Sequence, residues 1–109
     1  MANSFKVSAV AGVGTTTTDA YICPSSTSTT VIGLSLANIS TSQITVTAVV
    51  SIQGGATASL VKDATIPVGS SLVVVGGDQK VVLGAGDEIK ITSSAVSSVD
   101  VVTSYLEIA

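Results

Sequence analysis

The chain has 109 residues, which is enough for one domain spanning residues 1–109 and one core that buries about two thirds of the unfolded surface. Hydrophobic residues make up 46% of it, but they lie in short runs broken by Ser, Thr and Gly. No run approaches the ~18 to 20 apolar residues of a membrane span. Four scattered lysines against seven acidic residues give a net charge of -3, so we expect neither nucleic acid nor a membrane as a partner.

Only 10% of the residues are charged, which is low for a free monomer. A surface of Ser, Thr and Gly loses its water more easily than a charged one, so this composition favours close packing against other copies of the chain or against partner proteins. The single cysteine, Cys23, cannot form an internal disulfide, and the first residues lack the apolar segment of a signal peptide. We therefore expect synthesis in a reducing cytoplasm and a buried, unreactive thiol.

Alternation of apolar and polar residues predicts a first strand over residues 5–11, ending at residues 12–14. The Gly-Val-Gly there resembles the start of a phosphate-binding loop, but the four threonines that follow disfavour the helix which such a loop needs. A second strand is predicted over residues 16–22. It ends before Pro24, which lacks the amide proton of a ladder hydrogen bond.

Residues 24–30 are predicted to form a polar loop, followed by a strand over residues 31–37. Residues 43–52 have the clearest strand pattern, with an apolar residue at every second position, so we expect a central strand. A further strand is expected over residues 58–62. Three short apolar runs then follow between turn-forming Gly and Asp clusters, which predicts antiparallel strands at residues 72–75, 81–83 and 89–91.

The last predicted strand, residues 99–108, is apolar on both sides. One side carries Val99, Val101 and Tyr105. The other side carries Val102, Leu106 and Ile108. We expect a strand that lies between layers or under a neighbouring subunit.

Eight or nine short strands with regular turn signals and no helical period predict an all-β protein, an antiparallel β-sandwich. A jelly roll is the preferred topology, and an immunoglobulin-like sandwich is the alternative. Aromatic residues amount to 3%, so the core is expected to be aliphatic.

Two runs, TTVIGLSLANISTSQITVTAVV and LVKDATIPVGSSLVVVGGDQKVVLGAGDEIKITSSAVSSVDVVTSYLEI, resemble small virion structural proteins of tailed bacteriophages, particularly those of cyanobacteria and marine bacteria. The resemblance covers about residues 31–108, and its most specific parts are residues 73–80, 83–87 and 104–107. It implies a homo-oligomeric component of the virion that contacts phage capsid or tail proteins. Such proteins decorate or cement the head, or they belong to the tail, neck, baseplate or fibre. The resemblance supplies no catalytic residues.

An enzyme is not expected, because the chain has no His and its acidic residues mostly lie at strand ends. No cofactor is expected either. One Cys without His cannot supply the usual zinc ligands, and the turns at Asp78 and Asp87 are predicted to be structural rather than calcium sites. A carbohydrate-binding module is a further alternative, but the only aromatic residues are Phe5, Tyr21 and Tyr105, far apart in the sequence.

The function predicted from the sequence is therefore structural: capsid decoration in a virion, with a tail or fibre role as the alternative. Contacts with neighbours are expected through loops and partly apolar strand faces. The candidate contact residues are Val99, Val101, Tyr105, Ser25, Thr27, Gly76 and Gly77.

Overall fold

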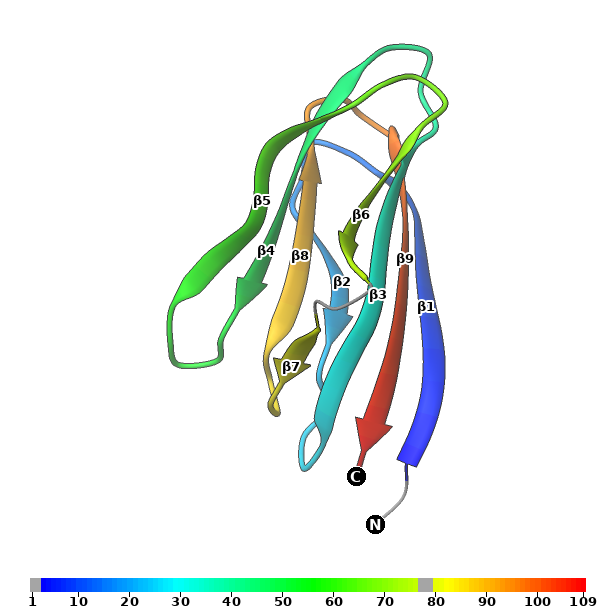
Figure 1. The fold of residues 1–109 in the computed structure, drawn as a ribbon. Coiled ribbons are helices and arrows are strands. Elements are labelled where there is room, and N and C mark those ends of the chain that lie inside the picture. Colours follow the sequence, from blue (N-terminus) through cyan, green and yellow to red (C-terminus); the bar gives the residue numbers. More distant parts are fainter. Residues whose placement is uncertain (1–2, 77–79) are drawn as a thin grey trace.

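The computed structural model describes residues 3–76 and 80–109, and these form nine β-strands without a helix (Figure 1). The described residues therefore include no helix long and apolar enough to cross a membrane. The strands are β1 (Asn3–Val13), β2 (Thr18–Ile22), β3 (Ser28–Asn38), β4 (Ile44–Ser51), β5 (Thr57–Ile66), β6 (Ser71–Val75), β7 (Val81–Leu83), β8 (Glu88–Ser93) and β9 (Val99–Ile108).

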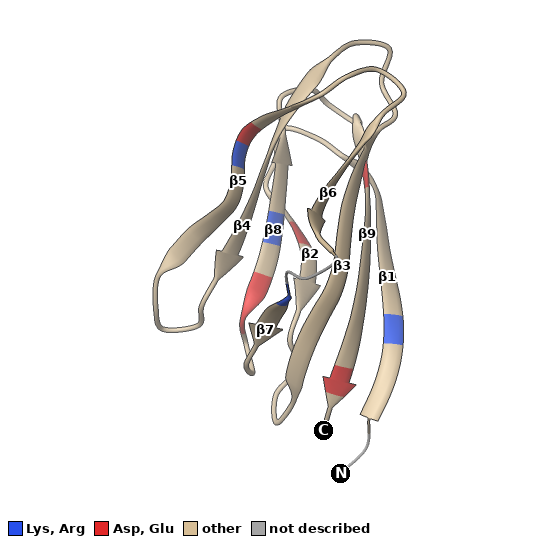
Figure 2. Ribbon diagram, viewed as in Figure 1, with Lys and Arg blue, Asp and Glu red and all other residues tan. Residues whose placement is uncertain are grey.

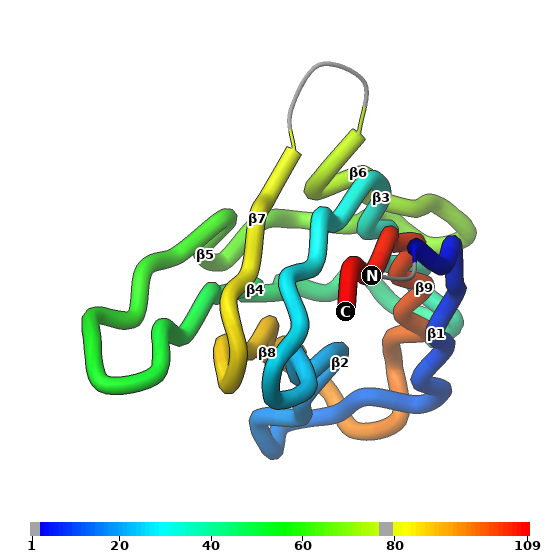
Figure 3. Tube along the Cα trace, turned by 90° about the horizontal axis from the view of Figure 1, so that it is seen from below, coloured from blue at the N-terminus to red at the C-terminus, as the bar shows by residue number. Residues whose placement is uncertain are grey.

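The strands form two antiparallel sheets packed face to face, so the predicted β-sandwich is confirmed (Figures 1 and 3). Sheet A has the order β1-β9-β3-β6, with β7 also paired to β3, and sheet B has the order β2-β8-β4-β5. The chain crosses from one sheet to the other at every connection except those between β4 and β5 and between β6 and β7. This winding is the double Greek key of a jelly roll, the preferred topology, rather than that of an immunoglobulin-like sandwich.

The core lies between the sheets and is almost entirely aliphatic, as expected. Alternate residues of each inner strand point into it, and the largest fully buried side chains include Leu34, Leu36, Ile44, Ile89 and Ile91. Branched side chains fit the pleated inner surfaces and pack at close distance across the roughly 10 Å gap between sheets. The molecule is elongated along the strands, with extents of 45 × 26 × 23 Å.

Both ends of the sandwich are closed by connections between strands. At the upper end in Figure 1 the β1–β2 connection lies against the β8–β9 connection: Ser98 N donates to Val13 O at 3.0 Å and Ser93 N donates to Gly14 O at 2.9 Å. A Cβ atom on Gly14 would lie 3.1 Å from Ser97 N and from Val96 Cα. A larger residue would push these two backbones apart by a few tenths of an ångström, so glycine suits this close approach.

Most strand boundaries fall within two residues of those expected, but β1, β3 and β5 are longer. The first three residues of β3, residues 28–30, were expected to belong to the polar loop, whereas β3 starts at Ser28 and pairs with β9 along its whole length. Its early residues are held by partners distant in sequence, Ile108 and Glu107 opposite Ser28 and Thr29. A Ser and Thr composition cannot reveal such pairing.

Candidate interaction surfaces and the polar network at the lower end

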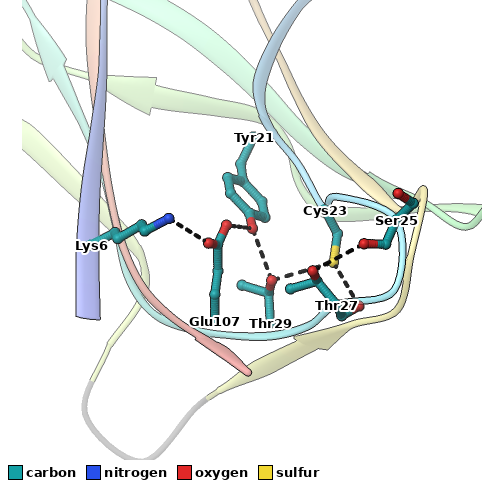
Figure 4. Close-up of polar contacts among 7 residues, drawn as sticks. All are labelled: Lys6, Tyr21, Cys23, Ser25, Thr27, Thr29 and Glu107. Atoms are coloured by element: carbon teal, nitrogen blue, oxygen red, sulfur yellow. Dashed lines mark hydrogen bonds and ion pairs between the residues drawn. The ribbon is translucent and has the colours of Figure 1, made fainter. Parts of the chain in front are cut away.

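A chain of polar contacts joins the two sheets at the lower end of the sandwich (Figure 4). Lys6 on β1 donates to Glu107 on β9, with Nζ and Oε1 2.8 Å apart. The other carboxylate oxygen accepts from Tyr21 on β2, with the phenol oxygen and Oε2 2.6 Å apart. Tyr21 belongs to sheet B and Glu107 to sheet A, so this short charge-assisted bond ties the sheets together.

The network continues inward from Tyr21. Since the phenol proton points to the carboxylate, the hydroxyl of Thr29 on β3 donates to the phenol oxygen over 2.8 Å. Cys23 Sγ lies 3.3 Å from Thr29 Oγ1 and 3.3 Å from Thr27 O. The rings of Tyr21 and Tyr105 pack with their centroids 4.3 Å apart. The thiol is buried, as predicted, at 1% exposure.

The electrostatics of the network follow from these contacts. Hydrogen bonds from Lys6 and from Tyr21 hold the pKa of Glu107 below its usual value. Burial, and next the hydrogen bond to Glu107, raise the pKa of Tyr21, and the bond to Glu107 raises the pKa of Lys6. Near neutral pH the network thus holds a carboxylate, a neutral phenol and an ammonium group. These are the states that make a stable clamp between sheets.

The buried carboxylate of Asp87 is also committed to structure. Its Oδ1 accepts from Gln53 N and its Oδ2 from Gly84 N, each at 2.9 Å. The predicted structural role of this turn is confirmed. Asp78, the other turn considered for calcium, lies outside the described residues. No group of three metal-ligating side chains and no pocket is found in the part of the chain that the structure describes.

The prediction that three residues of the last strand contact a neighbouring protein is wrong, because these residues are buried. Val99, Val101 and Tyr105 point into the sandwich and are 0%, 1% and 8% exposed. They pack between the sheets, so they are not accessible to a neighbouring protein. The outward side of β9 is the opposite one, on which Val102 is 42% exposed.

The other predicted contact residues are scattered. Ser25 and Thr27 lie in the tight β2–β3 loop at the lower end, where the Thr27 hydroxyl donates to Ser25 O at 3.1 Å (Figure 4). Gly76 follows β6 on sheet A and is partly exposed, and Gly77 lies outside the described residues. The fold does not bring the described members of this set together into one surface.

A surface that sequence reasoning missed is the outer face of sheet A. Directly paired residues of an antiparallel sheet share a face, and the register gives three rows across the strands. The first row is Phe5, Leu106, Thr30 and Val82; the second is Val7, Ser104 and Gly33; the third is Ala9, Val102, Ser35 and Val73. The apolar alternation of residues 5–9 was visible in the sequence, but not the fact that it faces outward.

The exposure of this face is large for apolar side chains. Phe5 is 78% exposed, Val82 70%, Val7 66% and Val73 64%. Single exposed apolar residues are normal on protein surfaces, whereas a contiguous group across several strands marks an interaction site. The outer face of sheet A is therefore the strongest candidate functional surface.

No protein-family model matches the chain, and no curated protein matches it. Among solved structures, the chain is similar to a subunit of the disulfide-linked pili that form Bacillus endospore appendages, with a TM-score of 0.59. The identity is 14%, and the match covers 98% of this chain and 88% of that one. The similarity supports the β-sandwich fold and, at this identity, nothing finer.

Proposed function

We propose that the chain is a non-enzymatic structural subunit that acts by docking through the outer face of sheet A. A rigid sandwich with a clamped lower end offers a fixed surface, and several exposed apolar side chains on it give a neighbour something to bury. The observation that carries the proposal is that apolar face. Many copies turn a weak contact of this kind into a stable one through avidity.

The assembly that we favour is the virion of a tailed bacteriophage, with the chain as a decoration or cement protein on the head. The support is the sequence resemblance described above, the small size and the charge-poor composition. A place in the tail, neck, baseplate or fibre is the alternative. Of the aromatic residues that a sugar site would use, Tyr21 and Tyr105 are buried against each other and Phe5 alone is exposed, which makes a carbohydrate-binding role the weaker choice.

A filament subunit is a second candidate, because the same fold occurs in a pilus subunit to which this chain is similar over nearly its whole length. Those pili are disulfide-linked. The one cysteine of this chain is buried, and its thiol donates a hydrogen bond to the Thr27 carbonyl oxygen. Contacts between copies in a filament of this chain would therefore be non-covalent.

The copy number of the chain in purified phage particles tests the proposal, measured by quantitative mass spectrometry against the major capsid protein. Hundreds of copies are expected for a head decoration protein, and a few to a few dozen would move it to the tail, neck or baseplate. Absence from the particles would refute the virion assignment.

A further inference from the structure

The three rows on the outer face of sheet A are mostly apolar and contain no charged residue. They contain only Phe, Val, Leu, Ala, Gly, Ser and Thr. Lys6 and Glu107 turn to the side that faces sheet B (Figure 4). Asp100, near the upper end of β9 (Figure 2), lies on the outward side beyond the third row, where its Oδ1 accepts a hydrogen bond from Gly12 N at 3.0 Å. Lys80 precedes the first residue of β7, at the border of the face.

The size of the face matches a small protein interface. Four strands about 4.8 Å apart and about seven residues with a rise of about 3.3 Å give a flat area of about 450 Å². Two such faces in contact would bury roughly 900 Å² before the relief of the side chains is counted, close to the ~1,000 Å² at which specific interfaces begin. A weak pairwise contact is the expected result.

We infer that this face pairs with the same face of a second copy of the chain, back to back, so that two sandwiches form a four-layer unit. Sheets pack face to face when their twists match, and a second copy has the same twist. A two-fold axis also brings an apolar, uncharged patch onto itself without opposing like charges. A foreign partner selected by charge pairing would find no charged group in the rows.

The inference deepens the proposed function, on which it rests for the premise that the chain acts by assembly. It names the surface and the partner. It is tested on the isolated 109-residue chain, so absence of the chain from phage particles would refute the virion assignment and leave this test unaffected. A monomeric chain would refute the paired face and leave the particle analysis unaffected.

The test is sedimentation velocity of the purified chain from about 1 μM to about 1 mM. Val7→Asp puts a charge into the middle row, and Val96→Asp is the matched control. The two substitutions add the same charge at similarly exposed positions, since Val96 is 75% exposed and Val7 66%. Val96 lies in the β8–β9 connection, away from the face. Val102→Ser is a second face variant that removes apolar area without adding charge, one strand in from the sheet edge.

We expect the unchanged chain to dimerise with a dissociation constant on the order of 10 μM to 1 mM. Val7→Asp should raise this constant more than about tenfold, Val102→Ser about threefold or more, and Val96→Asp less than about twofold. Thermal unfolding of each variant checks that the fold is retained.

Three results would overturn the inference. A chain that stays monomeric to about 1 mM has another occupant on this face. If Val96→Asp and Val7→Asp raise the dissociation constant equally, the overall charge of the chain and not this face controls dimerisation. If Val7→Asp weakens dimerisation and Val102→Ser does not, the contact lies at the free edge of β1 instead of on the face.

Discussion

Replacing Tyr21 by Phe should destabilise the fold by about 2 to 3 kcal/mol at neutral pH. The change removes one hydroxyl and keeps the ring that packs on Tyr105. The lost bond to the Glu107 carboxylate, at 2.6 Å, belongs to the class worth about 1.5 to 3 kcal/mol, and the bond to Thr29 to the class worth about 0.5 to 1.5 kcal/mol. The expected cost is less than the upper ends of the two ranges added together, because Lys6 still contacts Glu107 and the Cys23 thiol still lies beside Thr29.

The assay is urea unfolding followed by circular dichroism, in which the midpoint should fall while the slope stays constant. A double-mutant cycle with Glu107→Gln separates the contribution of the pair. The pH dependence gives an independent check. The pKa of Glu107 is lowered in the folded state, so its contribution is present above the ordinary value of 4.5 and is lost as the pH falls through the folded value.

The cost of Tyr21→Phe should therefore shrink on acidification. The pKa of Glu88 is raised by its hydrogen bond with Asp19, so Glu88 contributes with the opposite sign, at low pH, and its contribution is lost as the pH rises through the folded value. The difference between the two proteins cancels that effect and isolates Glu107. A cost below about 0.5 kcal/mol, or one that is the same at neutral and at acid pH, would refute the clamp between the sheets.

Two further changes test the core and the upper end. Thr103→Val should stabilise the fold by about 1 kcal/mol and raise the midpoint of thermal unfolding, because the Thr103 hydroxyl is fully buried and has no hydrogen-bond partner among the described residues. A lower midpoint would show that the hydroxyl has such a partner. Gly14→Ala should cost about 1 to 3 kcal/mol in urea unfolding, because its Cβ would press on the backbone of Val96 and Ser97, and an unchanged midpoint would mean that the two connections separate freely.

The strands and the sandwich could be predicted from the sequence because turn residues and β-branched runs act locally. Where both sides of a strand are apolar, the sequence could not show which side faces the core and which faces solvent. On β9 the buried side contains Thr103 and Tyr105, while Val102 on the other side is 42% exposed. Hydrophobicity there assigns the wrong side to solvent, because an apolar outer face hides the contrast between core and surface on which the two-residue period depends.

The polar network could not be predicted for a different reason. Its members meet across distances of 86 residues between Tyr21 and Glu107 and 101 residues between Lys6 and Glu107. No local pattern encodes such a contact, and strand order decides it. Once β1 and β9 are neighbours in sheet A and β2 faces them from sheet B, the three side chains converge at the lower end (Figures 1 and 4).

The clamp and the outer face are linked through Lys6. Charged side chains on an edge strand, including ones that point inward, block unwanted pairing with other sheets. β1 is the edge of sheet A, and its lysine turns to the inner side and forms an ion pair with Glu107, while Phe5 and Val7 on either side of it point outward. The ion pair thus closes the end of the sandwich and at the same time keeps charge off the outer face. In a free monomer an uncharged outer face leaves apolar area in water, whereas a subunit that buries this face against a neighbour avoids the cost of removing a charge from water.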